Sequence, residues 1–209
     1  MIIQGTPEWF AARAGKVTAS RVADVIAKTK TGYSTSRANY LAELLCERLT
    51  GVCEPGFTSG PMQWGKDQEP FARQAYERRH EVEVYEVGFV DHPEIGMSGA
   101  SPDGYVGECG LVEIKCPLTA THLDTLLNGT IPGRYVTQIQ WQLACAGREW
   151  CDFISFDPRL PHAMQMFVQR IPRDPSTVLE LEGEVSGFIR ELDAKVAQLQ
   201  AQYGERKAA

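Results

Sequence analysis

Apolar residues recur at steps of three or four along residues 5–80, which is the spacing of amphipathic helices. Four helices are expected, within residues 5–20, 18–30, 36–51 and 62–80. The second has a cap-like Thr18 or Ser20 at its start, and Gly51 is the expected stop of the third. Pro70 lies inside the fourth helix, where it removes one backbone hydrogen bond and can kink the helix.

The middle of the chain changes to short alternating or apolar runs bounded by glycine and proline, which is the pattern of β-strands. Strands are expected within residues 82–92, 96–107, 110–117, 149–159 and 163–173, and helices within 120–129 and 134–147. From Pro175 the chain is again helical, with an apolar stripe that faces the core. The stripe consists of Leu181, Val185, Phe188, Leu192, Val196 and Leu199.

This order of elements predicts an α/β fold of the α+β kind, with one central mixed sheet flanked by helices. The length of 209 residues fits a single domain, residues 1–209. Within it we expect a helical N-terminal part over residues 1–80, a sheet core over 81–172 and a C-terminal helix over 175–205.

The composition is that of an ordinary globular protein, with 43% hydrophobic and 23% charged residues. The formal net charge of −6 is mild evidence against nucleic-acid binding, although a basic groove can coexist with an acidic exterior. No apolar run approaches the roughly 20 residues that span a bilayer. The six cysteines form no Cys-x-x-Cys pair, and the first residues do not read as a signal peptide. We therefore expect reduced thiols in a cytoplasmic protein. A zinc or iron–sulfur site remains open, but the cysteine spacing does not support one.

Candidate chemistry is concentrated in residues 98–117, which read SGASPDGYVGECGLVEIKCP. Residues two apart in a strand share a face, so Glu113 and Lys115 project side by side from an otherwise apolar run. Asp103 lies beyond a preceding turn and can return to the same place. Two carboxylates and a lysine at a sheet suit Mg²⁺ and the hydrolysis of phosphodiesters. The alternative is an ion pair at a sheet edge, without a catalytic role.

Further motifs follow one another along most of the chain, from about Trp9 to the C-terminal helix. They are ARAGKVTAS, IAK, WGKDQEPFAR, SPDG, LVEIKCP, YVTQIQWQ and FDPR. In this order they resemble the phage lambda exonuclease-like (YqaJ-type) viral recombinases, a family with the PD-(D/E)xK nuclease fold. The resemblance implies the same fold for this chain and assigns roles to the matching residues.

By this resemblance Asp103 and Glu113 are metal-binding carboxylates, and the Ile114 carbonyl is a further ligand. Lys115 is the catalytic lysine. Glu69 is the helix-borne acid that completes the metal site and holds water. Without the resemblance, Glu69 reads equally as a solvated helix charge.

The resemblance also places Tyr135, Gln138 and Gln140 in one motif beside the active centre. The two glutamines lie roughly 200° apart on a helix of 3.6 residues per turn, so only one can face the site squarely. We expect Gln140 to face it and to contact the scissile region. The alternative is that both are ordinary polar positions of a helix.

A pocket for a 5′-phosphate is implied as well, since the matching positions carry the guanidinium and hydroxyl groups that bind phosphate. Its candidates are Arg13, Thr18, Ser20 and Ser101. Ser20 reads alternatively as a helix N-cap. Met62 falls where the family has an apolar wedge that separates the strands, and Lys30 near a basic residue that follows the minor groove. The alternatives are a core methionine and a solvated lysine.

The resemblance implies a Mg²⁺-dependent exodeoxyribonuclease that digests duplex DNA 5′ to 3′, releases 5′-mononucleotides and leaves 3′ overhangs for recombination by strand annealing. Two metal ions are expected, and Mn²⁺ would satisfy the same oxygens. The expected partners are duplex ends, a single-strand annealing protein and two further copies of the chain in a homotrimeric ring. The chain would be encoded by a phage or prophage and act in the bacterial cytoplasm.

Three other functions remain open at the level of sequence. The first is another PD-(D/E)xK enzyme, such as a sequence-specific endonuclease; the cysteine spacing argues against a CRISPR-associated iron–sulfur nuclease. The second is a non-catalytic adaptor that binds DNA ends. The third is a metal-dependent hydrolase of a small phosphoester.

Overall fold

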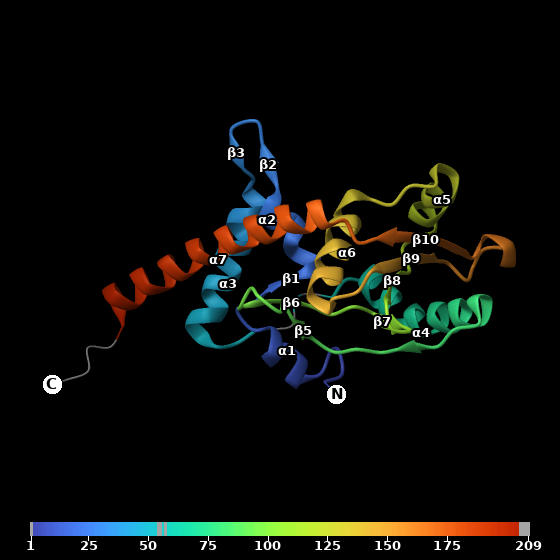
Figure 1. The fold of residues 1–209 in the computed structure, drawn as a ribbon, viewed down its shortest axis with the longest axis horizontal. Coiled ribbons are helices and arrows are strands. Elements are labelled where there is room, and N and C mark those ends of the chain that lie inside the picture. Colours follow the sequence, from blue (N-terminus) through green and yellow to red (C-terminus); the bar gives the residue numbers. More distant parts are fainter. Residues whose placement is uncertain (1, 54–55, 57, 205–209) are drawn as a thin grey trace.

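The computed structural model describes residues 2–53, 56 and 58–204. Two sheets form its centre and a separate hairpin projects from it (Figure 1). The helices are α1 (Pro7–Arg13), α2 (Val22–Ile26), α3 (Thr35–Thr50), α4 (Gly60–His80), α5 (Thr119–Asn128), α6 (Gly133–Ala146) and α7 (Pro175–Tyr203), with 3₁₀ turns η1 (Ala19–Arg21) and η2 (His162–Met164). The strands are β1 (Val17–Thr18), β2 (Lys28–Thr29), β3 (Gly32–Tyr33), β4 (Val84–Tyr85), β5 (Val90–Asp91), β6 (Ser98–Ala100), β7 (Gly104–Val106), β8 (Gly110–Lys115), β9 (Trp150–Phe156) and β10 (Met166–Pro172).

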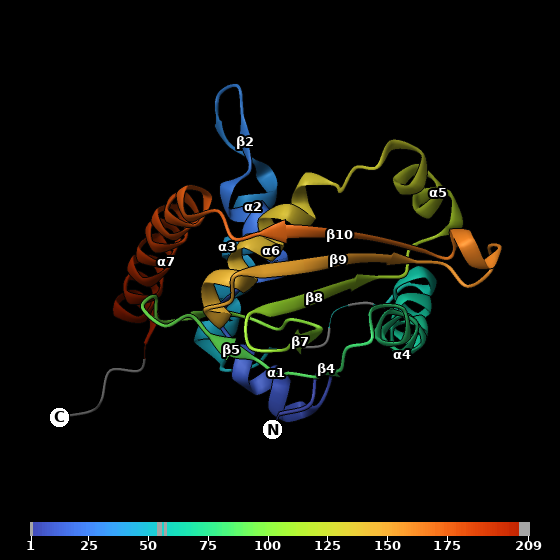
Figure 2. The same ribbon diagram turned by 45° about the vertical axis from the view of Figure 1, so that its right-hand side comes forward.

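The larger sheet has five strands in the order β10-β9-β8-β7-β4, which lie side by side in Figure 2. In this sheet, among the described residues, only the pair β8 and β9 is parallel, and α5 and α6 form the crossover that this pairing requires. The register pairs Lys115 with Ser155, so the carboxyl ends of both central strands lie at one edge of the sheet. The predicted mixed sheet is thereby confirmed.

Alternation along β8 places its side chains on two different cores, as the period of a strand requires. Val112 and Ile114 join a cluster with Ala72 and Tyr76 of α4. Leu111 joins a second cluster with residues of α6, β9 and β10. Helices α4 and α6 therefore cover opposite faces of the sheet, and Glu113 and Lys115 share the face of Leu111.

The expectation of one sheet is wrong, because β1, β6 and β5 form a second, three-stranded sheet. Pro102 follows β6 closely and cannot donate a ladder hydrogen bond, so the chain leaves this sheet before β7 begins. A third apolar cluster forms here between the N-terminal helices, α6 and α7. Trp141 and Cys145 of α6 belong to this cluster, while Ile139 and Leu143 belong to the core of the larger sheet. Helix α6 thus joins the two halves of the fold.

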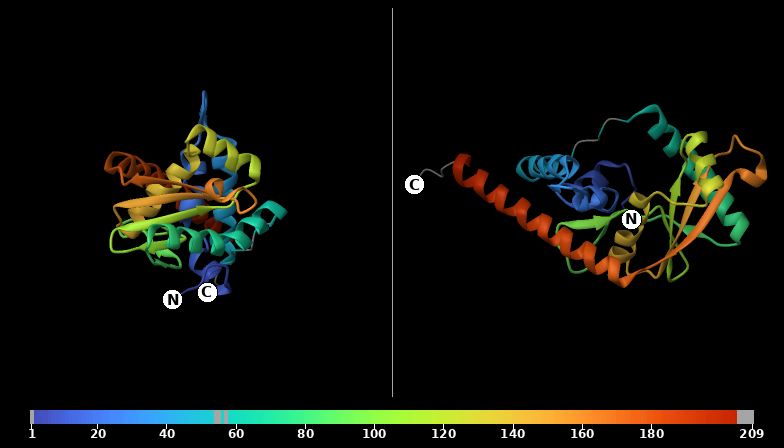
Figure 3. Two further views of the ribbon diagram at one scale, coloured as in Figure 1. Left: turned by 90° about the vertical axis from the view of Figure 1, so that its right-hand side faces the viewer. Right: turned by 90° about the horizontal axis from the view of Figure 1, so that it is seen from above.

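The helices expected over residues 36–51 and 134–147 are confirmed, and both end at a glycine in the left-handed conformation, Gly51 and Gly147. Helix α4 continues through Pro70 without a break from Gly60 to His80. In the long helix α7, seen along one side of the molecule in Figure 3, the first four residues of the predicted stripe are buried. Among the described residues, no helix is both long and apolar enough to cross a membrane.

The helix expected over residues 18–30 is wrong in its second half. Helix α2 ends at Ile26, and β2 and β3 form the projecting hairpin instead. β-Branched Thr29 and Thr31 and the flexible Gly32 favour a hairpin over a continued helix. Ser20 lies inside η1 and does not cap α2, whose N-cap position is Arg21. The N-terminal part of the chain is therefore not wholly helical.

Candidate active site

The buried carboxylate of Glu113 is the centre of the candidate active site. Its Oε1 accepts a hydrogen bond of 2.7 Å from Gln138 Nε2, and its Oε2 accepts one of 2.6 Å from Gln142 Nε2. Both glutamines come from α6, where a spacing of four residues places them on one face. Lys115, two residues along β8, forms an ion pair with the same carboxylate. A buried charge is stabilised only when it is paired and hydrogen-bonded, and Glu113 is both.

The register of the sheet brings Asp103 to the same place. Strand β7 pairs Gly104 with Val112 in antiparallel fashion, so Asp103 stands one step further on, opposite Glu113. Its Oδ2 accepts a hydrogen bond of 2.6 Å from the backbone N–H of Ile114. The N–H and C=O of one strand residue point to the same edge, so the Ile114 carbonyl faces this side as well. Burial of the carboxyl and the nearby charge of Glu113 raise the pKa of Asp103 well above its usual range.

Glu69 approaches the site from α4. One Glu69 oxygen lies 3.6 Å from Arg73 Nη2, one turn along the same helix. Burial raises the pKa of Glu69, and the neighbouring charges of Arg73 and Lys115 oppose that shift. Glu69 and Asp103 line one cavity of about 420 Å³ between α4 and the N-terminal residues.

A second cavity, of about 170 Å³, joins the residues predicted for the phosphate pocket to those predicted for the metal site. Its lining combines Arg13, Thr18, Ser20 and Ser101 with Asp103, Glu113, Lys115 and Gln138. These residues come from α1, β1, η1, the loop before β7, β8 and α6. The fold therefore brings two separate sequence predictions into one hollow.

Trp9 contacts two of the residues predicted to bind phosphate, although no sequence pattern assigned it a role. Its Nε1 donates a hydrogen bond of 2.9 Å to Ser101 Oγ, and the Arg13 guanidinium lies 3.9 Å from the centre of its ring. Trp9 and Arg13 are four residues apart in α1, so they share a face of that helix. Burial lowers the pKa of Arg13.

The donor set fits a hard divalent cation. Within residues 2–53, 56 and 58–204, no three Asp, Glu, His or Cys side chains are grouped closely enough to enclose an ion by themselves. Mg²⁺ does not require such a cage, since it keeps several waters and binds through one or two carboxylates together with substrate phosphate. Asp103 and Glu113 are adjacent carboxylates with Lys115 as their nearest cation, so a further positive charge is favourable there.

With the fold and the site described, the relationship to known proteins becomes specific. Residues 8–149 match the family model of the YqaJ-like viral recombinase domain. The chain belongs to this family. It is 52% identical to an alkaline exonuclease (LHK-Exo) from Laribacter hongkongensis, over 94% of this chain and 97% of that one, with a TM-score of 0.89. A structure of LHK-Exo in complex with dAMP matches equally well.

A phage related exonuclease from Haemophilus somnus 129PT shares the fold at 16% identity, with a TM-score of 0.71 over 88% of this chain and 96% of that one. Curated proteins give no match. The mixed α/β fold of PD-(D/E)xK type is thereby confirmed, and YqaJ-like membership agrees with the order of the motifs along the chain.

The expectation that Gln140 faces the active site is wrong for this YqaJ-like chain. Gln140 is buried on the other side of α6, where its Nε2 donates to Pro172 O at 2.9 Å and its Oε1 accepts from Asp174 N at 2.9 Å. It therefore fixes the start of α7. Gln138 and Gln142 face the site instead, and Gln142 was missed. The spacing of four residues between those two was the signal that could have identified it.

Replacing these glutamines separates the two roles. Gln140→Ala leaves two backbone groups without partners and is expected to cost about 1–3 kcal/mol of unfolding free energy, with catalysis unchanged below the transition. Gln138→Ala loosens Glu113 and is expected to reduce activity about 10- to 100-fold with a smaller loss of stability. Thermal unfolding and the rate of nucleotide release, measured on both variants, check this. If Gln140→Ala instead reduced activity and Gln138→Ala mainly reduced stability, Gln140 would belong to the active site.

The remaining predicted contacts lie around the cavity. Tyr135 stacks on Phe153 with 5.7 Å between ring centroids, and Lys115 Nζ lies 5.3 Å from the centre of the Tyr135 ring. Met62 is 54% exposed near the start of α4, and Lys30 is exposed at the tip of the β2–β3 hairpin. Neither lines the cavity, so their roles on DNA stay predictions.

Proposed function

We propose that the chain is a metal-dependent exonuclease that digests the 5′-ended strand of duplex DNA, 5′ to 3′, and leaves a 3′ single-stranded overhang. The observation that carries the proposal is the cavity that joins Arg13 and three hydroxyl-bearing residues to Asp103, Glu113 and Lys115. Membership of the YqaJ-like family and the 52% identity to an alkaline exonuclease support the exonuclease activity itself.

The carboxylates of Asp103 and Glu113 and the Ile114 carbonyl would hold Mg²⁺, and Glu69, which shares a cavity with Asp103, would complete the metal site and hold water. Two ions are proposed in all. Mn²⁺ would satisfy the same oxygens. When bound, the metal supplies a water of lowered pKa and stabilises the negative charge that develops on the phosphate.

The protein's own groups supply position and charge. Gln138 and Gln142 hold both oxygens of Glu113, so its carboxylate cannot rotate away from the cavity. Lys115 carries only hydrogen-bond donors, and it lines the cavity beside Asp103. We infer that it orients the attacking water and stabilises the charged phosphate oxygens.

The proposed direction is supported by the lining of one cavity by both sets of residues. A terminal 5′-phosphate held by Arg13, Ser20 and Ser101 leaves the next phosphodiester at the carboxylates. Cleavage there releases one 5′-mononucleotide and renews the 5′-phosphate on the shortened strand. The complex of the related LHK-Exo with dAMP supports a binding site for a mononucleotide. A circular duplex has no terminal phosphate and would not enter.

Arg13→Gln is expected to reduce nucleotide release from a 5′-phosphorylated end about 10- to 100-fold, because a hydrogen bond to a charged group contributes about 1.5–3 kcal/mol. Release from a 5′-hydroxyl end should change little. The ratio of the two rates is the measurement, and Arg190→Gln on the exposed face of α7 is the matched control. If nucleotide release falls equally from both kinds of end, Arg13 has a structural role and does not recognise the phosphate.

The function is tested with linear duplex labelled at the 5′ or the 3′ end, and with closed circular duplex, each with Mg²⁺ and with EDTA. We expect release of the 5′ label as mononucleotide with Mg²⁺ only, and an intact circle. Nicking of the circle would indicate an endonuclease. Retention of ends without cleavage would indicate a DNA-end-binding adaptor, and cleavage of mononucleotides alone would indicate a small-phosphoester hydrolase.

We also propose that residues 1–209 act as one nuclease domain within a homotrimeric ring, beside a single-strand annealing protein that loads on the overhang. The reaction would serve phage or prophage recombination in the bacterial cytoplasm. The two clusters that share α6 support a single domain. Enclosure of DNA by a ring would also allow a chain of net charge −6 to stay on its substrate, because only the channel lining need be basic.

A further inference from the structure

The β2–β3 hairpin stands clear of the rest of the chain (Figures 1 and 2). Its strands belong to neither large sheet and pair only with each other, Lys28 with Tyr33 and Thr29 with Gly32. The Thr29 hydroxyl accepts a hydrogen bond from Thr31 N and donates one to Gly32 O, which holds the turn. The hairpin is therefore short and hydrogen-bonded within itself, so the position of its base influences the position of its tip.

The tip carries a cation that is free to meet DNA. Lys30 is exposed, and among the described residues it has no ion-pair partner. The hairpin follows Ser20, a residue of the candidate phosphate pocket, after a helix of five residues, which rises only about 8 Å. A duplex whose 5′ end occupies the pocket would thus pass near this hairpin.

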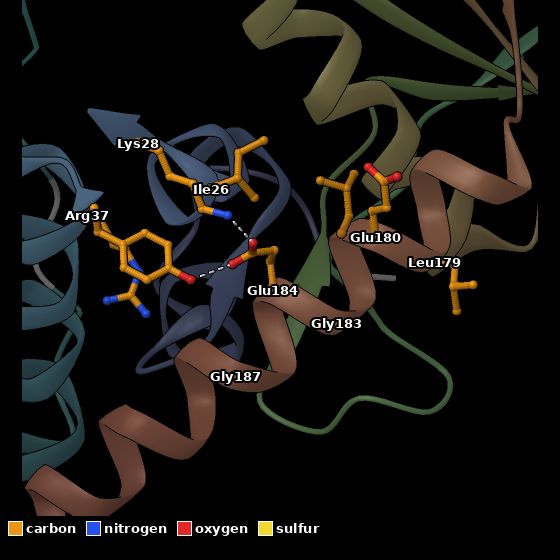
Figure 4. Close-up of a pocket in the computed structure, with 10 residues that line it drawn as sticks. Ile26, Lys28, Arg37, Leu179, Glu180, Gly183, Glu184 and Gly187 are labelled. Atoms are coloured by element: carbon orange, nitrogen blue, oxygen red, sulfur yellow. Dashed lines mark hydrogen bonds and ion pairs between the residues drawn. The ribbon is translucent and has the colours of Figure 1, made fainter. Parts of the chain in front are cut away.

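One carboxylate on α7 holds the base of the hairpin. Glu184 Oε1 accepts a hydrogen bond of 2.7 Å from Lys28 Nζ, and Glu184 Oε2 accepts one of 2.8 Å from Tyr33 Oη. Lys28 and Tyr33 are the pair furthest from the tip, so both strands are fixed at once. Figure 4 shows Glu184 facing Lys28 and the tyrosine ring, with the two interactions drawn as dashed lines.

Among the described residues, few contacts other than that of Glu184 connect the hairpin to α7. A hollow of about 680 Å³ lies between the hairpin and α7, so few other groups bridge them. Tyr33 receives one further support from α3, where the guanidinium of Arg37 lies 4.0 Å from its ring centre and pairs with Glu191 at 2.8 Å. Because Glu184 neutralises Lys28, Lys30 is the cation of the hairpin that remains for phosphate.

We propose that Glu184 is a positioning residue for duplex DNA: by holding Lys28 and Tyr33 it fixes the angle of the hairpin and thereby places Lys30 against the phosphates of the entering duplex. The proposal rests on the proposed function, since it names the group that orients the substrate for the same site. Glu184 itself touches no DNA.

The experiment compares Glu184→Ala, Glu184→Gln and Lys30→Ala with the wild-type chain. Glu180→Ala is the matched control, because Glu180 lines the same hollow one turn earlier on α7, and Figure 4 draws no interaction between it and the hairpin residues. The readouts are the Kd for a 5′-phosphorylated duplex in EDTA, its salt dependence, and KM and kcat with Mg²⁺.

Lys30→Ala is expected to raise Kd and KM about five- to tenfold with kcat unchanged, and to reduce the slope of log Kd against log salt by about 1. Glu184→Ala should raise Kd and KM by a similar factor, although it releases Lys28, because the hairpin then no longer holds Lys30 in place. Tighter binding of duplex by Glu184→Ala would overturn the proposal. The double variant should have a Kd no higher than that of either single variant, because Glu184 acts through Lys30, although the two residues do not touch. Glu184→Gln, which keeps an acceptor, should restore most of the affinity. Glu180→Ala should behave as the wild type.

The proposal would be overturned if the losses of affinity of the two single variants add up in the double variant. It would also be overturned if Glu184→Ala lowers thermal stability but leaves Kd and the salt slope unchanged, because Glu184 would then have only a structural role. If the losses of affinity are coupled but the wild type does not cleave duplex DNA, the positioning role would stand and the proposed nuclease activity would be refuted. A wild-type chain that neither binds nor cuts duplex would refute both.

Discussion

Lys115→Ala is expected to reduce the rate of nucleotide release by about 10³-fold, while the protein still binds 5′-phosphorylated duplex. Lys115 is the nearest cation to Glu113 and Asp103, and it lines the cavity where the scissile phosphate is proposed to lie. Its loss removes charge stabilisation that acts mainly in the transition state, so kcat falls while Kd for DNA changes little. Single-turnover release of a 5′ label with Mg²⁺ is the measurement.

The removal of Lys115 also leaves the buried Glu113 carboxylate with less compensation, so lost stability must be distinguished from lost chemistry. Lys115→Gln keeps a donor for Glu113 and should fold as the wild type yet be as inactive as the alanine variant. Lys195→Ala, an exposed lysine on α7, is the control for general loss of charge. Activity within tenfold of wild type in both Lys115 variants would show that Lys115 is only the ion-pair partner of Glu113.

Asp103→Asn is expected to reduce the rate of nucleotide release by about 10³-fold, as Lys115→Ala does. It is also expected to raise thermal stability in EDTA. The amide oxygen of the new side chain would still accept the hydrogen bond from Ile114 N, but one of two adjacent carboxylates would lose its charge. At a pH above the raised pKa of Asp103, where both carboxylates are charged, relief of that repulsion should contribute about 1 kcal/mol, which is about 2–4 °C in Tm for a chain of this size. Wild-type protein should gain stability on addition of Mg²⁺, and the Asp103→Asn variant should gain little.

Differential scanning fluorimetry with and without Mg²⁺ measures both effects on the same samples. Asp91→Asn is a suitable control, because Asp91 pairs with Lys16 and lines neither of the two active-site cavities. A metal site at Asp103 would be contradicted if Mg²⁺ leaves the Tm of the wild-type protein unchanged. It would also be contradicted if Mg²⁺ raises the Tm of the Asp103→Asn variant as much as that of the wild type.

The core of the site could be predicted because its residues are local and periodic. Alternation in β8 fixed the shared face of Glu113 and Lys115, and the short separation from Asp103 to the strand limited where that acid could lie. Gly51 and Gly147 marked helix ends because each adopts the left-handed conformation that glycine favours. These signals depend on neighbours in sequence and need no knowledge of the tertiary fold.

Other features depend on contacts between distant segments, which periodicity does not encode. Gln138 and Gln140 look alike in sequence, and only the packing of α6 between β8 and the start of α7 decides that Gln140 turns away. Trp9 acts through Ser101, which lies 92 residues further along. The division into two sheets depends in the same way on which strands meet, and short strands of two or three residues carry little pattern.

The cavity at the active site is lined by residues spread from Gln4 to Gln138, and Gln140 ties the helix behind it to Asp174. A chain that is still being synthesised therefore lacks the assembled candidate site, because the carboxylates, the lysine and the residues proposed to bind a terminal phosphate come together only through contacts of large sequence separation. We therefore expect nascent or truncated chains to have no nuclease activity until the fold is complete.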